Sequence, residues 1–339
     1  MKYDTRRTPL RRRSVQLAAS LGAVLAGGCA SVPAIAPVLL ARAQDRTPPS
    51  PDEVTVRWLG VAGFELRAGA SVLLLDPYLS RSGLAETALG HLASDEALLE
   101  EVLPEAQLIL IGHSHFDHLL DAPAIARRTG AAIVGTRTTC WIAGAMGTAA
   151  DRCRSVAPNE RFELGPFAIT AIASRHASLP VIGVPVAGVL DRAPRWKHPH
   201  AGEMPMGGAL IWVIRVAGLT IVHISSAGLP EALDALNRAV PEGADLVLAG
   251  IASREGTPGY ARRLIAGLSP RALVPHHYDP LFGPIEAELP EESQADLKAF
   301  VAEARGATVM PLPRFEAVRF TRASLNALSP AKIPDAVMP

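Results

Sequence analysis

The chain has 339 residues, 49% of them hydrophobic, so it can bury the core of one large α/β domain or of two fused halves. Lys plus Arg and Asp plus Glu balance at 33 each, and only 5% of the residues are aromatic. We therefore expect no nucleic-acid partner, because the chain lacks both the basic excess and the stacking side chains that such binding needs.

Residues 1–45 are typical of a bacterial export signal and are left out of the predicted fold. Arg12-Arg13 in a basic head resembles a twin-arginine signal, and the apolar stretch 15–28 is shorter than the roughly 20 residues that span a bilayer. Two processing sites stay open. "LAGGC" resembles a lipoprotein box that would make Cys29 the lipidated first residue, whereas "ARAQ" (41–44) is an ordinary A-x-A cleavage site. The expected location is the periplasm or cell envelope, and a lipidated Cys29 would attach the protein peripherally to a membrane.

Residues 46–53 form a proline-rich linker, so we place the folded domain at 54–322 and a loosely ordered tail at 323–339. Three short apolar runs separated by turn residues predict an antiparallel meander at 54–59, 63–68 and 71–76. Strands and helices then alternate: helices at 95–102 and 122–128, strands at 108–111 and 132–134. Asp121 can cap the second of these helices and Gly130 can end it.

The second half repeats this pattern, with strands at 167–173, 209–216, 219–224, 246–248 and 272–274 and helices at 231–238, 260–266 and 291–304. Meander strands combined with strand–helix units in both halves predict an α/β fold of two mixed β-sheets packed face to face and covered by helices. The connection 177–208 is long, apolar and rich in proline and glycine, and it is either a lid beside the site or contains a buried strand at 181–190. Cys140 and Cys153 can pair in an oxidising compartment or stay buried as thiols, and the sequence favours neither.

The stretch "GHSHFDH" (112–118) follows the apolar run "LILI" and concentrates metal-binding side chains at a strand end. His113 and His115 lie two residues apart on extended chain, so they can converge on one ion. Asp117 and His118 follow in the next turn, where they can face a second ion a few ångströms away. Such a concentration of donors predicts a metal centre.

His113-x-His115-x-Asp117-His118 after an apolar strand resembles the signature of the metallo-β-lactamase superfamily, whose fold is a four-layer αβ/βα sandwich. The resemblance extends over about 54–320. "WLGVAGFELRAGASVLLLDPYLS" resembles the opening hairpins of the branch that contains the UlaG-type lactonases and the N-acyl-phosphatidylethanolamine phospholipase D enzymes, in which a strand ends at an Asp-Pro pair, here Asp76-Pro77.

The resemblance implies two further ligands, each after a strand. His176 would complete a first site with His113 and His115, and His277 a second site with Asp117 and His118. His276 competes with His277 for this role, but neighbouring strand residues point to opposite faces and His277 fits the family pattern better. Two zinc ions are expected, the second less firmly held, with manganese or iron as alternatives.

One family ligand is missing. The superfamily usually has Gly-Asp after a later strand, and its aspartate bridges both metals; here "LTIVHISSAG" places Ser225 and Ser226 there. His223 has the opposite strand parity and is predicted to be a core residue. Either the remaining ligands still hold two ions, or the second ion binds weakly. In the first case Asp117 is the only negative ligand, so the centre is positively charged and favours an anionic substrate.

The predicted function is an exported zinc-dependent hydrolase that uses a metal-activated hydroxide on a small-molecule or lipid substrate, either a phosphodiester or phospholipid or a lactone or other ester. Asp117 would orient the attacking water. Asp76 would orient a ligand histidine or cap a turn, and Tyr278 and Asp279 would contact substrate or be ordinary exposed loop residues. The alternative is a degenerate, non-catalytic metal- or ligand-binding envelope protein, weakened by Ser226.

Overall fold

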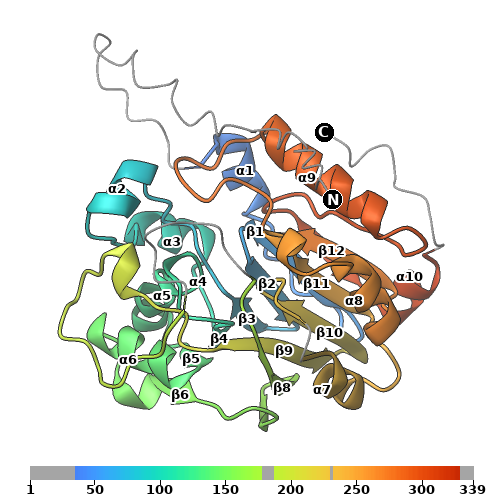
Figure 1. Cartoon of the computed structure of the whole chain (residues 1–339), viewed down its shortest axis with the longest axis horizontal. Coiled ribbons are helices and arrows are strands. Elements are labelled where there is room, and N and C mark those ends of the chain that lie inside the picture. The colour runs from blue at the N-terminus through green and yellow to red at the C-terminus, as the bar shows by residue number, and fades with distance from the viewer. Residues whose placement is uncertain (1–34, 178–186, 230–231, 329–339) are drawn as a thin grey trace, which may run out of the picture. The chain divides into compact units, whose positions relative to one another are not determined.

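In the computed structural model, residues 35–177, 187–229 and 232–328 are described (Figure 1). Most of the predicted export signal, including Cys29, lies outside these ranges, as do residues 178–186 of the connection 177–208 and the end of the predicted tail. No helix within the described ranges is both long enough and apolar enough to cross a membrane.

The first sheet has seven strands in the order β13-β1-β2-β3-β4-β5-β6. Its strands are β1 (Val54–Gly60), β2 (Gly63–Ala68), β3 (Ser71–Leu75), β4 (Leu108–Leu110), β5 (Ala132–Gly135), β6 (Cys153–Ser155) and β13 (Ala317–Phe320). β1, β2 and β3 are antiparallel, as the meander predicted, and β3 to β6 pair in parallel.

The second sheet has six strands in the order β12-β11-β10-β9-β8-β7. They are β7 (Arg161–Leu164), β8 (Phe167–Ser174), β9 (Ala209–Val216), β10 (Leu219–Ile224), β11 (Leu246–Gly250) and β12 (Ala272–His276). β7 to β10 form antiparallel pairs, and β10, β11 and β12 are parallel.

Helices cover the outer face of each sheet (Figure 1). Beside the first sheet lie α2 (Leu84–Leu89), α3 (Glu96–Val102), α4 (Phe116–Leu119), α5 (Ala122–Thr129) and α6 (Arg137–Ala145). Beside the second lie α7 (Ala232–Ala239), α8 (Tyr260–Leu268) and α9 (Glu291–Glu303). Short 3-10 helices occur at Ala150–Arg152, Ala201–Glu203 and Arg254–Gly256. The predicted four-layer αβ/βα sandwich is confirmed.

Strand alternation assigns side chains to the layers. In β3, Leu73 and Leu75 belong to the core that contacts the second sheet, whereas Val72 and Leu74 pack with the helices outside the first sheet. Because successive strand residues point to opposite faces, the four-residue apolar run 72–75 buries both faces of the sheet at once. For the same reason, the sequence of a central strand that is covered on both faces is continuously hydrophobic.

The fold begins before Val54, where the sequence placed its start. Helix α1 (Pro37–Arg42) packs on the domain, and Ile35, Leu39 and Ala43 are at most 2% exposed. The Ala36 N–H also donates to the carbonyl oxygen of Ile285 at 2.9 Å. Part of the segment interpreted as a removable signal is therefore part of the core.

The fold also continues further than the predicted tail boundary. Helix α10 (Arg322–Asn326) buries Leu325 at 2% exposure, and the Thr321 side chain accepts a hydrogen bond from the Ser324 N–H to begin it. Cys140 and Cys153, whose pairing the sequence left open, form a disulfide with Cα atoms 5.4 Å apart. This bond fastens α6 to β6 at the edge of the first sheet.

Candidate metal centre

The motif stretch, residues 112–118, connects the end of β4 to the start of α4. Gly112 follows β4, and its amide donates to Asp76 Oδ1 at 2.6 Å. Only glycine fits there, because a Cβ would lie 2.2 Å from Ser225 Oγ on the facing sheet. This close approach seats His113 between the two sheets, fully buried, while Asp117 and His118 fall in α4.

The first group of ligand side chains is His113, His115 and His176. One donor atom from each lies within 4.8 Å of the others. The ring centroid of His113 lies 4.7 Å from the centroids of His115 and His176, and those two centroids are 4.8 Å apart. Nε2 of His113 is buried and has no hydrogen-bond partner among the described residues, as a nitrogen aimed at a metal would be. Three convergent imidazoles are a donor set suited to zinc.

The second group is Asp117, His118 and His277. Asp117 Oδ2 lies 3.2 Å from Nε2 of His118 and 3.2 Å from Nε2 of His277. His277 has a φ of 63°, and its amide donates to Val61 O at 2.9 Å. This left-handed turn directly after β12 brings its ring to the carboxylate.

His276, the competing candidate, points into the core instead. Its ring is fully buried, lies 5.3 Å from the His223 ring and makes an edge contact with Phe64 at 5.1 Å. His223 is the core residue that its strand parity predicted. The two neighbouring histidines thus face opposite sides of the chain, and His277 alone of the pair joins the ligand group.

Asp76 holds the ligands in place. Its Oδ2 lies 2.9 Å from Nδ1 of His118, so that nitrogen is the donor and Nε2 is turned toward the ligand group. Its other oxygen accepts the Gly112 amide, so one buried carboxylate supports both ends of the motif stretch. Such a carboxylate–histidine pair fixes the imidazole tautomer and orientation. Of the two roles predicted for Asp76, the geometry matches the orienting one.

The pKa shifts differ between the two ligand groups: His113 and His176 of the first have lowered values, whereas in the second His118 has a raised value and Asp117 a lowered one. Burial, together with the neighbouring His118 and His115, places the pKa of His113 well below its usual value, and burial lowers the pKa of His176 to about 4. Both imidazoles are therefore neutral, as metal ligands must be. Burial alone would lower the pKa of His118, but the carboxylates of Asp117 and Asp76 outweigh it and raise the value to about 10. Burial would likewise raise the pKa of Asp117, but His118 and His277 hold it well below its usual value.

The two serines in place of Gly-Asp are not in either ligand group. Ser226 Oγ accepts the Ala177 amide at 2.9 Å, which fixes the backbone beside His176. Ser225 Oγ lies 3.4 Å from Nδ1 of His113, on the side opposite the free Nε2. Ser226 therefore positions the backbone next to His176, and Ser225 contacts the ring of His113; neither serine belongs to a ligand group.

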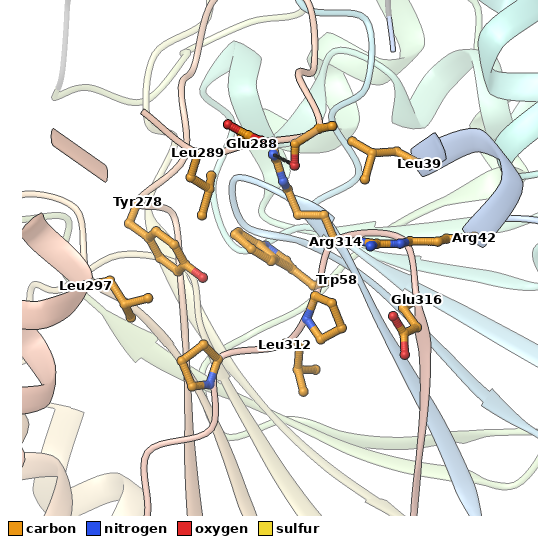
Figure 2. Close-up of a pocket in the computed structure, with 13 residues that line it drawn as sticks. Leu39, Arg42, Trp58, Tyr278, Glu288, Leu289, Leu297, Leu312, Arg314 and Glu316 are labelled. Atoms are coloured by element: carbon orange, nitrogen blue, oxygen red, sulfur yellow. Dashed lines mark hydrogen bonds between the residues drawn. The ribbon is translucent and has the colours of Figure 1, made fainter. Parts of the chain in front are cut away.

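Tyr278 and Asp279 were predicted either to contact substrate or to be exposed loop residues. Both are buried instead. Asp279 Oδ1 accepts the Val61 amide at 2.8 Å, and its Oδ2 pairs with Arg81 at 2.7 Å, with the side chain fully buried. Tyr278 stacks at a tilt on Trp58, with centroids 5.0 Å apart, and lines a separate pocket (Figure 2). The substrate-contact prediction is wrong for Asp279, because the carboxylate holds the turn that presents His277.

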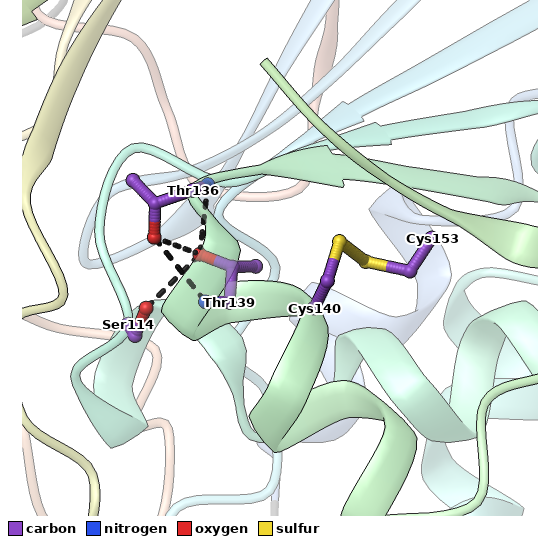
Figure 3. The surroundings of a disulfide bond; sticks show 5 residues. All are labelled: Ser114, Thr136, Thr139, Cys140 and Cys153. Atoms are coloured by element: carbon purple, nitrogen blue, oxygen red, sulfur yellow. Dashed lines mark hydrogen bonds between the residues drawn. A yellow bond between two sulfur atoms is a disulfide. The ribbon is translucent and has the colours of Figure 1, made fainter. Parts of the chain in front are cut away.

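One contributor was missed from the sequence. Thr139, in the first turn of α6, shares a 2.9 Å hydrogen bond with Ser114, the residue between the first two ligands (Figure 3). Thr136 and Thr139 form a capping box, and Cys140 of the same turn carries the disulfide to β6. The Thr-x-x-Thr spacing could have signalled the helix start, but not the contact with Ser114.

The geometry and the comparisons agree on the class of protein. Residues 55–277 match the beta-lactamase superfamily domain, so the chain belongs to the metallo-β-lactamase superfamily. It is similar to the UPF0173 metal-dependent hydrolase of Thermococcus onnurineus, with 34% identity over 70% of this chain and 90% of that protein, and to that of Anaeromyxobacter sp. strain K, with 31% identity over 72% and 80%. The chain is a metal-dependent hydrolase.

Solved structures support the fold at lower identity. The metallo hydrolase Igni18 of Ignicoccus hospitalis superposes with a TM-score of 0.51 at 18% identity, covering 79% of this chain and 98% of that one. CmlA, a diiron β-hydroxylase of Streptomyces venezuelae, superposes with a TM-score of 0.52 at 15% identity, over 80% and 55%.

Proposed function

We propose that this protein is an exported, zinc-dependent phosphodiesterase with two metal ions, acting on a small-molecule or lipid phosphodiester. The observation that carries the proposal is the donor set: two groups of three ligand side chains that contain a single carboxylate, Asp117. Two dications held by one carboxylate would leave a positive centre, which favours an anionic substrate over a neutral one. Iron or manganese would fit the mixed second group, and CmlA holds two irons on this fold.

The fit to metal rests on the protein's own side chains. His113, His115 and His176 would hold one ion, and Asp117, His118 and His277 the other. Bound ions would supply a water of lowered pKa and a Lewis acid for the phosphoryl oxygen. Asp117 can also orient that water as an acceptor. Asp76 fixes the ring of His118, and the hydrogen bonds that Val61 makes with His277 and Asp279 fix the turn that carries His277.

The disulfide supports the exported location. Cys140–Cys153 joins two secondary elements, and such structural disulfides persist in oxidising compartments such as the bacterial periplasm. Export in the folded state by the twin-arginine route would let the protein acquire its metal first. Fractionation of the native host, with the disulfide state determined by thiol labelling, tests this part separately.

The test of catalysis combines metal content with substrate choice. We expect purified protein to contain about two metal ions per chain, mainly zinc, and to hydrolyse bis(p-nitrophenyl) phosphate. His113→Ala should lose metal and activity. The matched control is His198→Ala, at an exposed histidine outside both ligand groups, which should keep both. Metal-free protein, or equal metal in both variants, would refute the proposal.

Lactone and ester hydrolysis is the second candidate, because the same centre can polarise a carbonyl. Turnover of γ-lactones with no turnover of the phosphodiester would replace the first proposal by the second. Ser226 favours a third outcome, a binding protein without catalysis. Activity gained only in Ser226→Asp would support that degenerate state, whereas activity in the unmodified protein excludes it.

A further inference from the structure

A pocket apart from the ligand groups is lined by residues of α1, β1 and α9, by the loops before and after α9, and by Tyr278, which follows His277 (Figure 2). Its volume is about 400 Å³, within the range of small-molecule sites. None of the metal-ligand residues lines it. Its wall is mainly apolar and aromatic: Leu39, Trp58, Tyr278, Leu289, Leu297 and Leu312.

Two arginines add positive charge to this apolar wall. Arg314 is only 5% exposed, and its guanidinium donates to the carbonyl oxygens of Glu286 and Ala287. Burial lowers the pKa of Arg314, and the charges of Arg81 and Arg42 lower it further despite the nearby Asp279. An anion bound near these side chains would relieve this repulsion.

Arg42 is the cation available to a ligand. It is exposed, its side chain extends over the pocket toward Arg314 in Figure 2, and no carboxylate lies within 4 Å of it among the described residues. Glu288 and Glu316 also line the pocket and are exposed, so water and salt screen their charges as they screen that of Arg42, whereas Arg314 is buried.

We propose that this pocket binds an amphipathic organic anion, with its carboxylate paired to Arg42 and its hydrocarbon body against Trp58, Tyr278 and Leu297. The apolar wall provides the area that a hydrocarbon chain buries, and a guanidinium pairs with a carboxylate through charge-assisted hydrogen bonds. The site needs α1, which contributes both Leu39 and Arg42. It does not depend on the reaction catalysed at the metal centre.

The probe is decanoate, titrated calorimetrically into the metal-loaded protein that retains α1, with decan-1-ol as the uncharged comparison. We expect saturable decanoate binding that Arg42→Gln weakens by about tenfold or more, with little change for decan-1-ol. Leu297→Trp, which fills the pocket, should abolish binding of both. Arg238→Gln, at an exposed arginine on α7, is the matched control and should leave both affinities unchanged.

Two results would overturn the proposal. The first is no saturable binding of decanoate in the millimolar range. The second is decanoate affinity that is the same in Arg42→Gln and in the unmodified protein, because the carboxylate would then be bound elsewhere, for example at the metal centre. Arg42 is exposed, so its variant keeps the fold and decides the question even where Leu297→Trp does not fold.

Discussion

Leu39 offers a direct test of whether the segment before the predicted linker belongs to the folded protein. Its side chain is 1% exposed and packs in the cluster outside the first sheet, whereas its neighbour Val38 is 49% exposed on the same helix. Truncating a buried leucine removes its transfer free energy and leaves a cavity. We therefore expect Leu39→Ala to lower the free energy of unfolding by about 2–5 kcal/mol. Val38→Ala should change it by less than about 0.5 kcal/mol.

The assay is urea denaturation of both variants in the chain that retains α1, followed by tryptophan fluorescence and circular dichroism. A loss of this size is a large part of the roughly 5–15 kcal/mol that stabilises a typical domain. Equal midpoints for the two variants would show that α1 is not part of the core. The result also bears on processing, because cleavage after Ala43 would remove Ile35, Leu39 and Ala43 together. We expect the mature protein to begin upstream of Ile35, as cleavage before Cys29 would leave it, and its intact mass after export checks this.

Two further predictions concern the disulfide and the pH dependence. Replacing Cys140 and Cys153 together by serine should lower the free energy of unfolding by about 3 kcal/mol, because the bond restricts the unfolded chain by closing a loop of this length; an unchanged melting temperature would contradict this. In metal-free protein the pKa of His118 is raised to about 10 by Asp117 and Asp76 despite burial, so its stabilisation is full below about pH 6.5 and is lost as the pH rises through about 10. The melting temperature of the metal-free protein should fall from pH 7 to pH 10, and His118→Asn should flatten that slope; the same slope in both proteins would count against the assigned pKa shift.

The four ligands of the motif stretch were predictable because donors concentrate there after an apolar strand, a position that sequence patterns mark well. His176 and His277 were predicted from the family resemblance. Strand parity, which is a local property, predicted that only one of His276 and His277 reaches the ligand group, and the family pattern selected His277. The role of Asp279 was not predictable, because its partner Arg81 is 198 residues away and nothing near Asp279 marks the ion pair. The start of the fold was missed for a different reason. The apolar run 35–40 directly precedes the A-x-A site at 41–44, so it resembles the end of a signal sequence whether or not it later packs on a domain.

The two ligand groups have a mechanical consequence. His113 and His115 follow β4 in the first sheet, whereas His176 follows β8 in the second; Asp117 and His118 likewise belong to the first half and His277 follows β12. Between the halves the protein itself provides backbone bonds such as the Leu210 amide to Gly112 O at 2.7 Å. An ion bound to either group would therefore act as a cross-link between the sheets. Chelation should loosen the seam between them before it loosens either sheet, and hydrogen exchange should rise first at β9 and around Gly112.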